Sequence, residues 1–223
     1  MKKIFSVKVI TLFPDSFPGT LGLGVIGKAF KNKLWKLQTI DIRNFGKGNH
    51  NKVDDTTAGG GPGMILKADV LSGAIDKSLK NIKDKKKMPI IYLSPRGKPL
   101  TQSKVKKLSK NDGIILLCGR YEGVDQRALD KYKIEEVSLG DFILAGGEIA
   151  AQATLEAIIR LIPGVLGDSE SLNNESFSSD LLEYPQYTRP RMWKNIEIPQ
   201  VLNSGNHKKI DAWRKDMSKK LTK

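Results

Sequence analysis

The chain has 223 residues, of which 39% are hydrophobic and 28% charged, a composition typical of a globular protein with a buried core. Its single cysteine, Cys118, excludes a framework of internal disulfides and favours a reducing, cytoplasmic setting. No apolar run approaches the roughly 20 residues that span a bilayer, so no membrane partner is expected. Lys and Arg outnumber Asp and Glu by 38 to 24, and the net charge of +14 favours a nucleic-acid partner over a merely solvated basic surface.

The first predicted elements alternate between strands and helices. Residues 7–13 form an apolar run ended by Pro14, which predicts a buried strand. A helix is predicted over residues 22–35, and a second strand over residues 37–42. The polar stretch 43–63 predicts a long loop, and loops of this length inside a compact domain are usually functional or disordered.

The alternation continues through the middle of the chain. Helices are predicted over residues 67–80, 101–108, 125–130 and 148–162, and strands over residues 89–93, 114–118 and 136–139. Thr101 is a candidate N-cap, and Pro163 with Gly164 ends the last helix. Strands that alternate with helices predict an α/β fold with a mainly parallel sheet and helices on both of its faces.

The composition changes after Gly167. We predict an α/β domain over residues 1–167, a polar linker over residues 168–184, and a small basic helical domain over residues 185–223. The linker is rich in Ser, Asn, Asp and Glu and has little to bury. From residue 207 onward the chain contains seven Lys or Arg and only two Asp, with Trp213 among them. This last domain therefore fits a nucleic-acid partner.

Three apolar stretches pass directly into glycine-containing turns. They cover residues 90–97, 114–123 and 142–147, and we interpret each stretch as a buried strand with a tight exit. The last stretch leads at once into the apolar helix predicted from residue 148. Because parallel strands end at one edge of a sheet, the three exits are expected to converge on one small ligand.

Two glycine-rich segments have competing interpretations. Residues 22–27 match G-x-G-x-x-G, but Pro14 and Pro18 separate the preceding strand from the glycines, which argues against a dinucleotide fold. Residues 59–64 lack the Lys-Ser/Thr ending of a P-loop, so triphosphate hydrolysis is not expected. Close approach of their backbone to a ligand is slightly favoured over a plain flexible loop.

Other chemistries receive little support from the sequence. The two histidines lie in unrelated segments and there is one cysteine, so no zinc spacing exists, and Cys118 is interpreted as a core thiol. The predicted helix from residue 148 carries a polar stripe at intervals of four residues. Its last member, Arg160, either pairs with Glu156 or holds an anion or a base oxygen. The residues alone favour neither alternative.

Ten ordered motifs together resemble the bacterial tRNA (guanine-N1)-methyltransferase family, TrmD, of the knotted SPOUT class. The resemblance extends from about residue 7 to residue 215. The motifs are Leu12-Phe13-Pro14, Val53-Asp54-Asp55, Gly59-Gly60-Gly61-Pro62-Gly63-Met64, Tyr92-Leu93-Ser94-Pro95, Cys118-Gly119-Arg120-Tyr121-Glu122-Gly123, Gly140-Asp141, Gly146-Gly147-Glu148, Arg160 with Ile162-Pro163-Gly164-Val165-Leu166-Gly167, Tyr187-Thr188-Arg189-Pro190, and Leu202-Asn203-Ser204-Gly205-Asn206-His207.

The resemblance implies transfer of a methyl group from S-adenosyl-L-methionine to N1 of the guanosine 3′-adjacent to the tRNA anticodon. It also implies a C-terminal trefoil knot in the α/β domain and a homodimer whose active sites lie at the subunit interface. The family suggests Mg²⁺ as a second cofactor, although no metal-ligand cluster in the sequence demands it.

The resemblance assigns residues to the methyl donor and to the substrate. The donor residues belong to the three exits identified above: Tyr92, Leu93, Ser94, Pro95, Gly119, Arg120, Tyr121, Glu122, Gly123, Ser138, Leu139, Gly140, Asp141, Phe142, Ile143, Leu144, Gly146 and Gly147. The tRNA residues are Asp54, Gly63, Met64, Arg189, Ser204 and His207.

Two further residues are assigned to catalysis. Arg160 matches the arginine that stabilises charge developing on guanine O6. Glu175 stands before Ser176-Phe177, where the family has an aspartate, and is assigned as the base that removes the N1 proton. Asp168 and Asp180 are the other nearby carboxylates. The C-terminal domain also ends earlier than the family pattern.

Two other functions remain as alternatives. A non-catalytic basic RNA-binding α/β protein would bind tRNA with a steep salt dependence and form no methylated product. A dinucleotide oxidoreductase would bind a nicotinamide cofactor through residues 22–27.

Overall fold

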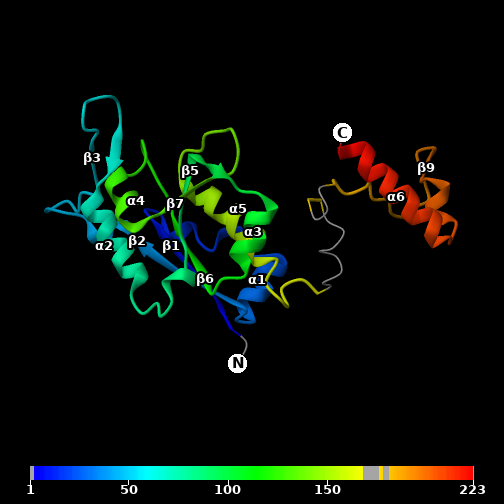
Figure 1. The fold of residues 1–223 in the computed structure, drawn as a ribbon, viewed down its shortest axis with the longest axis horizontal. Coiled ribbons are helices and arrows are strands. Elements are labelled where there is room, and N and C mark those ends of the chain that lie inside the picture. The colour runs from blue at the N-terminus through cyan, green and yellow to red at the C-terminus, as the bar shows by residue number, and fades with distance from the viewer. Residues whose placement is uncertain (1–2, 168–175, 178–180, 223) are drawn as a thin grey trace. The chain divides into compact units, whose positions relative to one another are not determined.

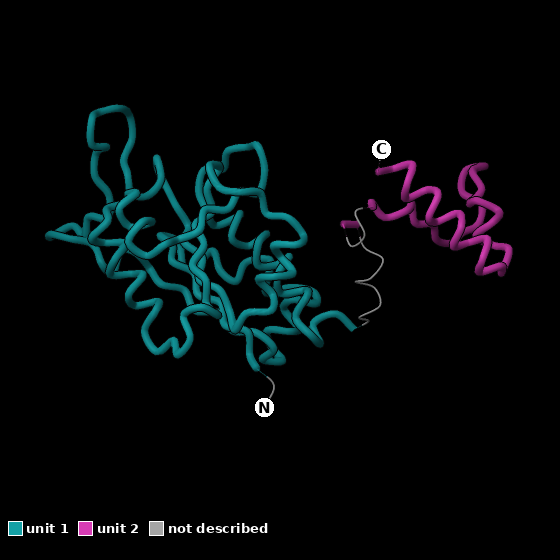
Figure 2. The backbone as a smooth tube through the Cα atoms, viewed as in Figure 1, with its two compact units in different colours: residues 1–167 teal, residues 168–223 magenta. Residues whose placement is uncertain are grey.

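The computed structural model describes residues 3–167, 176–177 and 181–222. The chain divides into two compact units, Met1–Gly167 and Asp168–Lys223 (Figure 2). Within the described residues, no helix is long and apolar enough to cross a membrane.

The first unit is built on a five-stranded sheet in the order β2-β1-β6-β5-β7. Every neighbouring pair runs parallel, which confirms the predicted mainly parallel α/β architecture. The strands are β1 (Phe5–Thr11), β2 (Trp35–Asp41), β5 (Ile90–Pro99), β6 (Gly113–Leu117) and β7 (Glu135–Ser138).

Helices cover both faces of this sheet (Figure 1). On one face, α1 (Gly24–Lys31), α3 (Gln102–Ser109) and α5 (Gly147–Ile159) share a core with Ile114 and Leu116 of β6. On the other face, α2 (Ala68–Leu79) and α4 (Gln126–Tyr132) pack over Ile115 and Leu117. Alternate residues of a strand point to opposite faces, so the continuous apolar run of β6 supplies both cores.

The predicted helix over residues 22–35 is too long at both ends. A 3₁₀ turn, η2 (Gly19–Gly22), precedes α1, and Lys33 has a positive φ of 58° that ends the helical region. Trp35 instead opens β2, where it is buried and its Nε1 donates a hydrogen bond 3.0 Å long to the Ile26 carbonyl. Burial of Trp35 between α1 and the sheet therefore outweighs the helical sequence pattern and places this residue in a strand.

The segment predicted as a loop over residues 43–63 is partly ordered. It begins within η3 (Ile42–Phe45), and β3 (Asp54–Thr56) pairs antiparallel with β4 (Met64–Leu66). The intervening glycines form the connection of this hairpin, so the glycine-rich stretch lies at a turn between two short strands.

The apolar run over residues 142–144 is not a buried strand, and that interpretation is wrong. Phe142, Ile143 and Leu144 lie in irregular structure and are 54%, 79% and 40% exposed. The strand ends earlier, at Ser138, and Gly140 has a φ of 155°. The chain therefore leaves the sheet before it reaches these three apolar residues.

Strand β5 is longer than predicted and carries an irregularity. Its pairing with β7 shifts register between Leu93 and Lys98, both of which pair with Val137. Extra residues in one strand bend it and redirect its side chains. The irregularity contains Ser94 and Pro95, which belong to one of the three predicted exits.

The second unit contains less regular structure. Its described part holds the hairpin of β8 (Met192–Trp193) and β9 (Ile196–Glu197), the 3₁₀ turn η6 (Gln200–Asn203) and the helix α6 (His207–Thr222). The short hairpin was not predicted, because two-residue strands leave no periodic pattern. Within this described part, only Ser218 is buried.

Candidate active site

A cavity of about 270 Å³ lies at the carboxyl ends of β5, β6 and β7. The three segments that leave these neighbouring strands form its walls, as expected for parallel strands that end at one edge. Every residue predicted to bind the donor lines the cavity except Asp141, which is exposed. Val137, Ala145 and Ala150 complete the lining and were not predicted.

The walls of the cavity are joined through backbone. The Gly147 N–H donates to the Gly119 carbonyl at 3.0 Å, which connects the segment after β7 to the segment after β6. A Cβ on Gly147 would lie 2.7 Å from the Cys118 Cα, a distance that packed atoms do not reach. Only glycine allows the two segments to pass this closely.

Side chains also brace the walls from within. The Ser138 hydroxyl donates to the Gly140 carbonyl at 3.1 Å and accepts from the Gly140 N–H at 3.2 Å. Burial, reinforced by the charge of Glu136, raises the pKa of Tyr92 above its ordinary value. The Tyr92 phenol forms part of the cavity wall.

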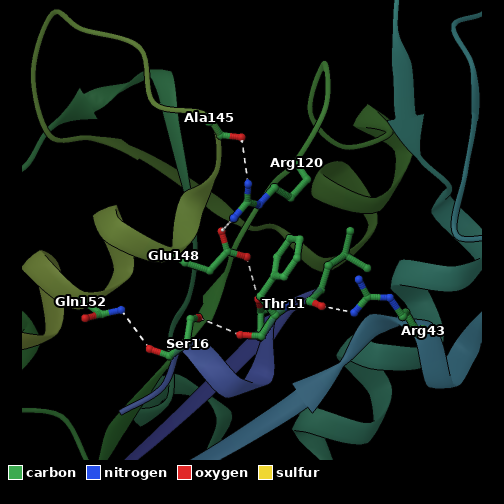
Figure 3. A network of polar contacts seen from close by, with 9 residues as sticks. Thr11, Ser16, Arg43, Arg120, Ala145, Glu148 and Gln152 are labelled. Atoms are coloured by element: carbon green, nitrogen blue, oxygen red, sulfur yellow. Dashed lines mark hydrogen bonds and ion pairs between the residues drawn. The ribbon is translucent and has the colours of Figure 1, made fainter. Parts of the chain in front are cut away.

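A polar network joins Arg120 and Ala145, which line the cavity, to the buried Glu148 (Figure 3). Glu148, in the first turn of α5, is 3% exposed and its Oε2 lies 2.8 Å from Arg120 Nη2. The Thr11 hydroxyl donates to Glu148 Oε1 at 2.7 Å and accepts from the Phe13 N–H at 2.9 Å. Arg120 Nη1 in turn donates to the Ala145 carbonyl at 3.3 Å.

The Phe13 ring extends this network toward the 3₁₀ turn η3. The Arg120 guanidinium carbon lies 4.3 Å from the ring centroid, and that of Arg43 lies 5.3 Å from it. Both distances are within the range of cation–π attraction. Arg43 also donates to the Leu12 carbonyl, which fixes its position beside the end of β1.

Cys118 is a core thiol, which confirms its interpretation from sequence. It is fully buried at the end of β6, and burial raises its pKa well above the ordinary value, with a further contribution from the Glu148 charge. A thiol held protonated is a poor nucleophile.

Three of the predicted substrate residues lie next to the cavity walls. The Met64 carbonyl accepts a hydrogen bond from the Glu122 N–H at 2.9 Å, and the preceding Gly63 packs against the Glu122 side chain. Asp54 lies near Tyr121, and burial followed by the Asp54 charge raises the pKa of the Tyr121 phenol. The β3–β4 hairpin is therefore in contact with a wall of the cavity.

Tyr121 also lines a second, open hollow, which it shares with Asp54. The rest of that hollow is basic and polar, with Arg43, Lys47, Asn49, His50 and Lys52 among its lining residues. Sequence reasoning did not assign these residues, because surface cations in a long loop resemble ordinary solvated charges.

The other predicted substrate residues belong to the second unit. Arg189 is exposed, and His207 is the first residue of α6. The Ser204 hydroxyl donates to the Val201 carbonyl at 2.7 Å and accepts from the Asn206 N–H at 3.2 Å, so it shapes the turn before that helix.

Of the two predicted catalytic residues, Arg160 lies away from the cavity. Arg160 is the C-cap of α5, whereas Ala150, in the second turn of the same helix, lines the cavity. Ten helical residues correspond to about 15 Å along the axis, so Arg160 is farther from this cavity than its side chain reaches. Glu175, like Asp168 and Asp180, lies outside the described residues.

The alternative sites receive no geometric support. Gly22, Gly24 and Gly27 surround the start of α1 and do not line the cavity at the strand ends. Among residues 3–167, 176–177 and 181–222, no group of three or more His, Cys, Asp or Glu side chains could hold a metal ion.

Comparison with known proteins decides the family. The sequence profile described as tRNA (Guanine-1)-methyltransferase TrmD matches residues 5–223. The chain belongs to the TrmD family. Proteins named tRNA (guanine-N(1)-)-methyltransferase include one from Ruegeria sp. (strain TM1040), 55% identical over 98% of this chain and 89% of its own length. Those from Caulobacter vibrioides and Zymomonas mobilis are 53% and 50% identical to this chain, which aligns with 88% of the length of each.

Proposed function

We propose that the protein transfers a methyl group from S-adenosyl-L-methionine to N1 of the guanosine 3′-adjacent to the anticodon of tRNA. Membership of the TrmD family supports the tRNA (guanine-N1)-methyltransferase activity. The main support for a donor site is the cavity at the ends of β5, β6 and β7, because its walls contain the family's donor motifs.

The lining of this cavity suits a nucleoside with a charged sulfonium. Glycines bring backbone amides and carbonyls to its surface, while Leu93, Val137 and Ala150 offer apolar contact. When bound, the donor supplies a methyl group on a positively charged sulfur, which is already activated toward a nucleophile. The protein then has to align that methyl with N1 and exclude water.

The acceptor has to be made nucleophilic. Guanine N1 carries a proton at neutral pH, and we assign Glu175 as the carboxylate that removes it, an effect of about 10²–10⁴-fold. Negative charge then develops on O6, where we assign Arg160 as the stabilising cation. Glutamate in place of the family's aspartate keeps the acid group and lengthens it by one methylene.

The position of Arg160 supports an active site shared between two subunits. Within one chain this residue lies about 15 Å along α5 from Ala150, so a second subunit would have to supply it to the cavity. Leu23 at the N-cap of α1, Val25 of α1 and Ile149 of α5 are exposed apolar side chains, and both helices lie on one side of the sheet. Exposed apolar residues of this kind suit burial against a second copy.

The remaining family properties complete the proposal. The close passage of Gly147 past Cys118 suits the trefoil knot expected in the C-terminal part of residues 1–167. Residues 185–223 are assigned as the tRNA-binding domain, joined by a linker over residues 168–184, and the basic helix α6 suits a phosphate backbone. Action on tRNA places the protein in the cytoplasm.

Methyl transfer to defined transcripts tests the proposal. Radiolabelled donor is expected to label a tRNA transcript with guanosine 3′ to the anticodon and guanosine before it, and to leave a transcript with adenosine at the target position unlabelled. Digestion of the product should yield N1-methylguanosine. Salt-dependent tRNA binding without any labelled nucleoside would instead favour the non-catalytic RNA-binding alternative.

A further inference from the structure

We propose that Glu148 is a positioning residue for the methyl donor. Its buried carboxylate holds the Arg120 guanidinium, and Arg120 holds two walls of the cavity at the spacing that the donor requires. The inference rests on the proposed function, because it names a further residue on which that donor site depends.

The burial of Glu148 gives the first reason. A carboxylate that is 3% exposed is costly unless it is paired and hydrogen-bonded. Glu148 has both kinds of partner, the Arg120 guanidinium at 2.8 Å and the Thr11 hydroxyl at 2.7 Å. It also lies in the first turn of α5, where the helix dipole favours negative charge.

The reach of Arg120 gives the second reason. Its backbone belongs to the wall after β6, and its Nη1 donates to the carbonyl of Ala145 in the wall after β7, at 3.3 Å. One side chain therefore bridges two walls, while Glu148 forms an ion pair with its guanidinium and the Phe13 ring contacts it. Figure 3 shows the guanidinium between Ala145 and Glu148.

The direction of the hydrogen bonds gives the third reason. The Thr11 hydroxyl accepts from the Phe13 N–H and so directs its own proton to Glu148 Oε1. Both partners of the carboxylate are thus donors, an arrangement that suits an ionised acid. Glutamine at this position would keep the shape but present an amide N–H₂ to one donor and remove the charge that attracts Arg120.

The main test is Glu148→Gln, compared with Glu135→Gln as a matched control. Glu135 forms an ion pair with Lys104 at the surface of the same sheet and does not line the cavity. For Glu148→Gln we expect at least a tenfold rise in the donor Kd by calorimetry and in the KM for donor. The KM for tRNA, and kcat at saturating donor, should change less than threefold. The control should match the parent protein.

Two further variants keep the test decisive if Glu148→Gln folds poorly. Thr11→Val removes the hydroxyl that donates to Glu148 and accepts from the Phe13 N–H, and is expected to weaken binding of the methyl donor about threefold. Glu148→Asp retains the charge with a shorter reach and should restore part of the affinity. A purely structural role would instead lower thermal stability and change kcat and both KM values together, and that result would overturn the inference.

The failure of the inference is distinguishable from failure of the proposed function. If the parent protein neither binds S-adenosyl-L-methionine nor methylates tRNA, the proposed function is wrong. If the parent protein does both and a folded Glu148→Gln variant binds the donor equally well, only the role of Glu148 is wrong.

Discussion

The cavity in the first unit and the described part of the second unit differ in how completely each is built. The cavity walls are joined by backbone hydrogen bonds and rest on a buried ion pair. In the second unit, Tyr187, Trp193 and Ile196 are exposed, and Ser218 is the buried residue of the described part. The walls of the cavity all come from a single chain, whereas the described part of the second unit presents apolar and basic side chains to solvent.

This difference indicates two ways of recognising a ligand. A small donor can be enclosed by walls that already have their final spacing, so little ordering is needed on binding. A tRNA is larger than the domain, and an open basic surface with exposed aromatic rings suits it better. We therefore expect changes at the cavity to act mainly on the donor and changes in the second unit to act mainly on tRNA.

The largest expected effect separates chemistry from donor binding. If Arg160 has the catalytic role proposed above, Arg160→Ala should lower kcat by about 10²–10³-fold, because the charge that develops on O6 would lose its cation. The donor Kd should stay within twofold, since Arg160 does not line the cavity. Single-turnover kinetics and calorimetry measure the two quantities. Equal losses in both would mean that Arg160 supports the cavity rather than the reacting base.

The next effect tests the preformed cavity itself. Gly147→Ala should weaken donor binding more than tenfold and destabilise the protein by about 1–3 kcal/mol, because the new Cβ meets the Cys118 backbone at 2.7 Å. Gly167→Ala is a matched control, since a Cβ there meets nothing within 4 Å. Thermal unfolding and donor titration are the measurements. If both variants behave alike, Gly147 and Cys118 are packed too loosely for a Cβ to matter.

A smaller effect is expected for the open region. Lys208→Ala with Lys209→Ala, in the first turn of α6, should weaken tRNA binding several-fold and reduce the dependence of log Kd on log salt by about 1–2. Donor affinity should not change. Filter binding across a salt series measures the slope, and an unchanged slope would remove α6 from the tRNA surface.

The smallest effect concerns folding rather than ligands. Asp125 caps α4, with its carboxylate accepting from the Arg127 N–H at 2.9 Å, and hydrogen bonds from Arg127 lower its pKa. Asp125→Ala should cost about 1 kcal/mol at neutral pH. Because the folded pKa is lowered, this stabilisation is complete above about pH 5 and is lost as pH falls through the folded value. Urea unfolding at several pH values should show the two proteins converging in acid.

Much of the fold could be predicted because strong local patterns agree with tertiary packing. The uninterrupted apolar run of β6 and the hydroxyl of Thr101, which accepts from the Lys104 N–H at the start of α3, each have a direct physical signature. The three exits could be recognised from glycine placement, and the parallel topology then brings them together.

The failures share a different cause. Phe142 to Leu144 look like strand residues, yet the positive φ of Gly140 takes the chain out of the sheet before them. Glu148 belongs to a family motif and to a polar stripe, but its contacts could not be predicted, because its partners Thr11 and Arg120 lie far away in sequence.

The single cysteine offers a built-in reporter of opening at the cavity. Cys118 is fully buried, its backbone passes close to Gly147, and burial keeps its thiol protonated, so a thiol reagent can modify it only after local opening. The labelling rate of the unmodified protein thus reports the free energy of that opening without an introduced probe. Donor saturation should slow labelling, and the factor of slowing gives the energy by which the donor keeps the segments closed.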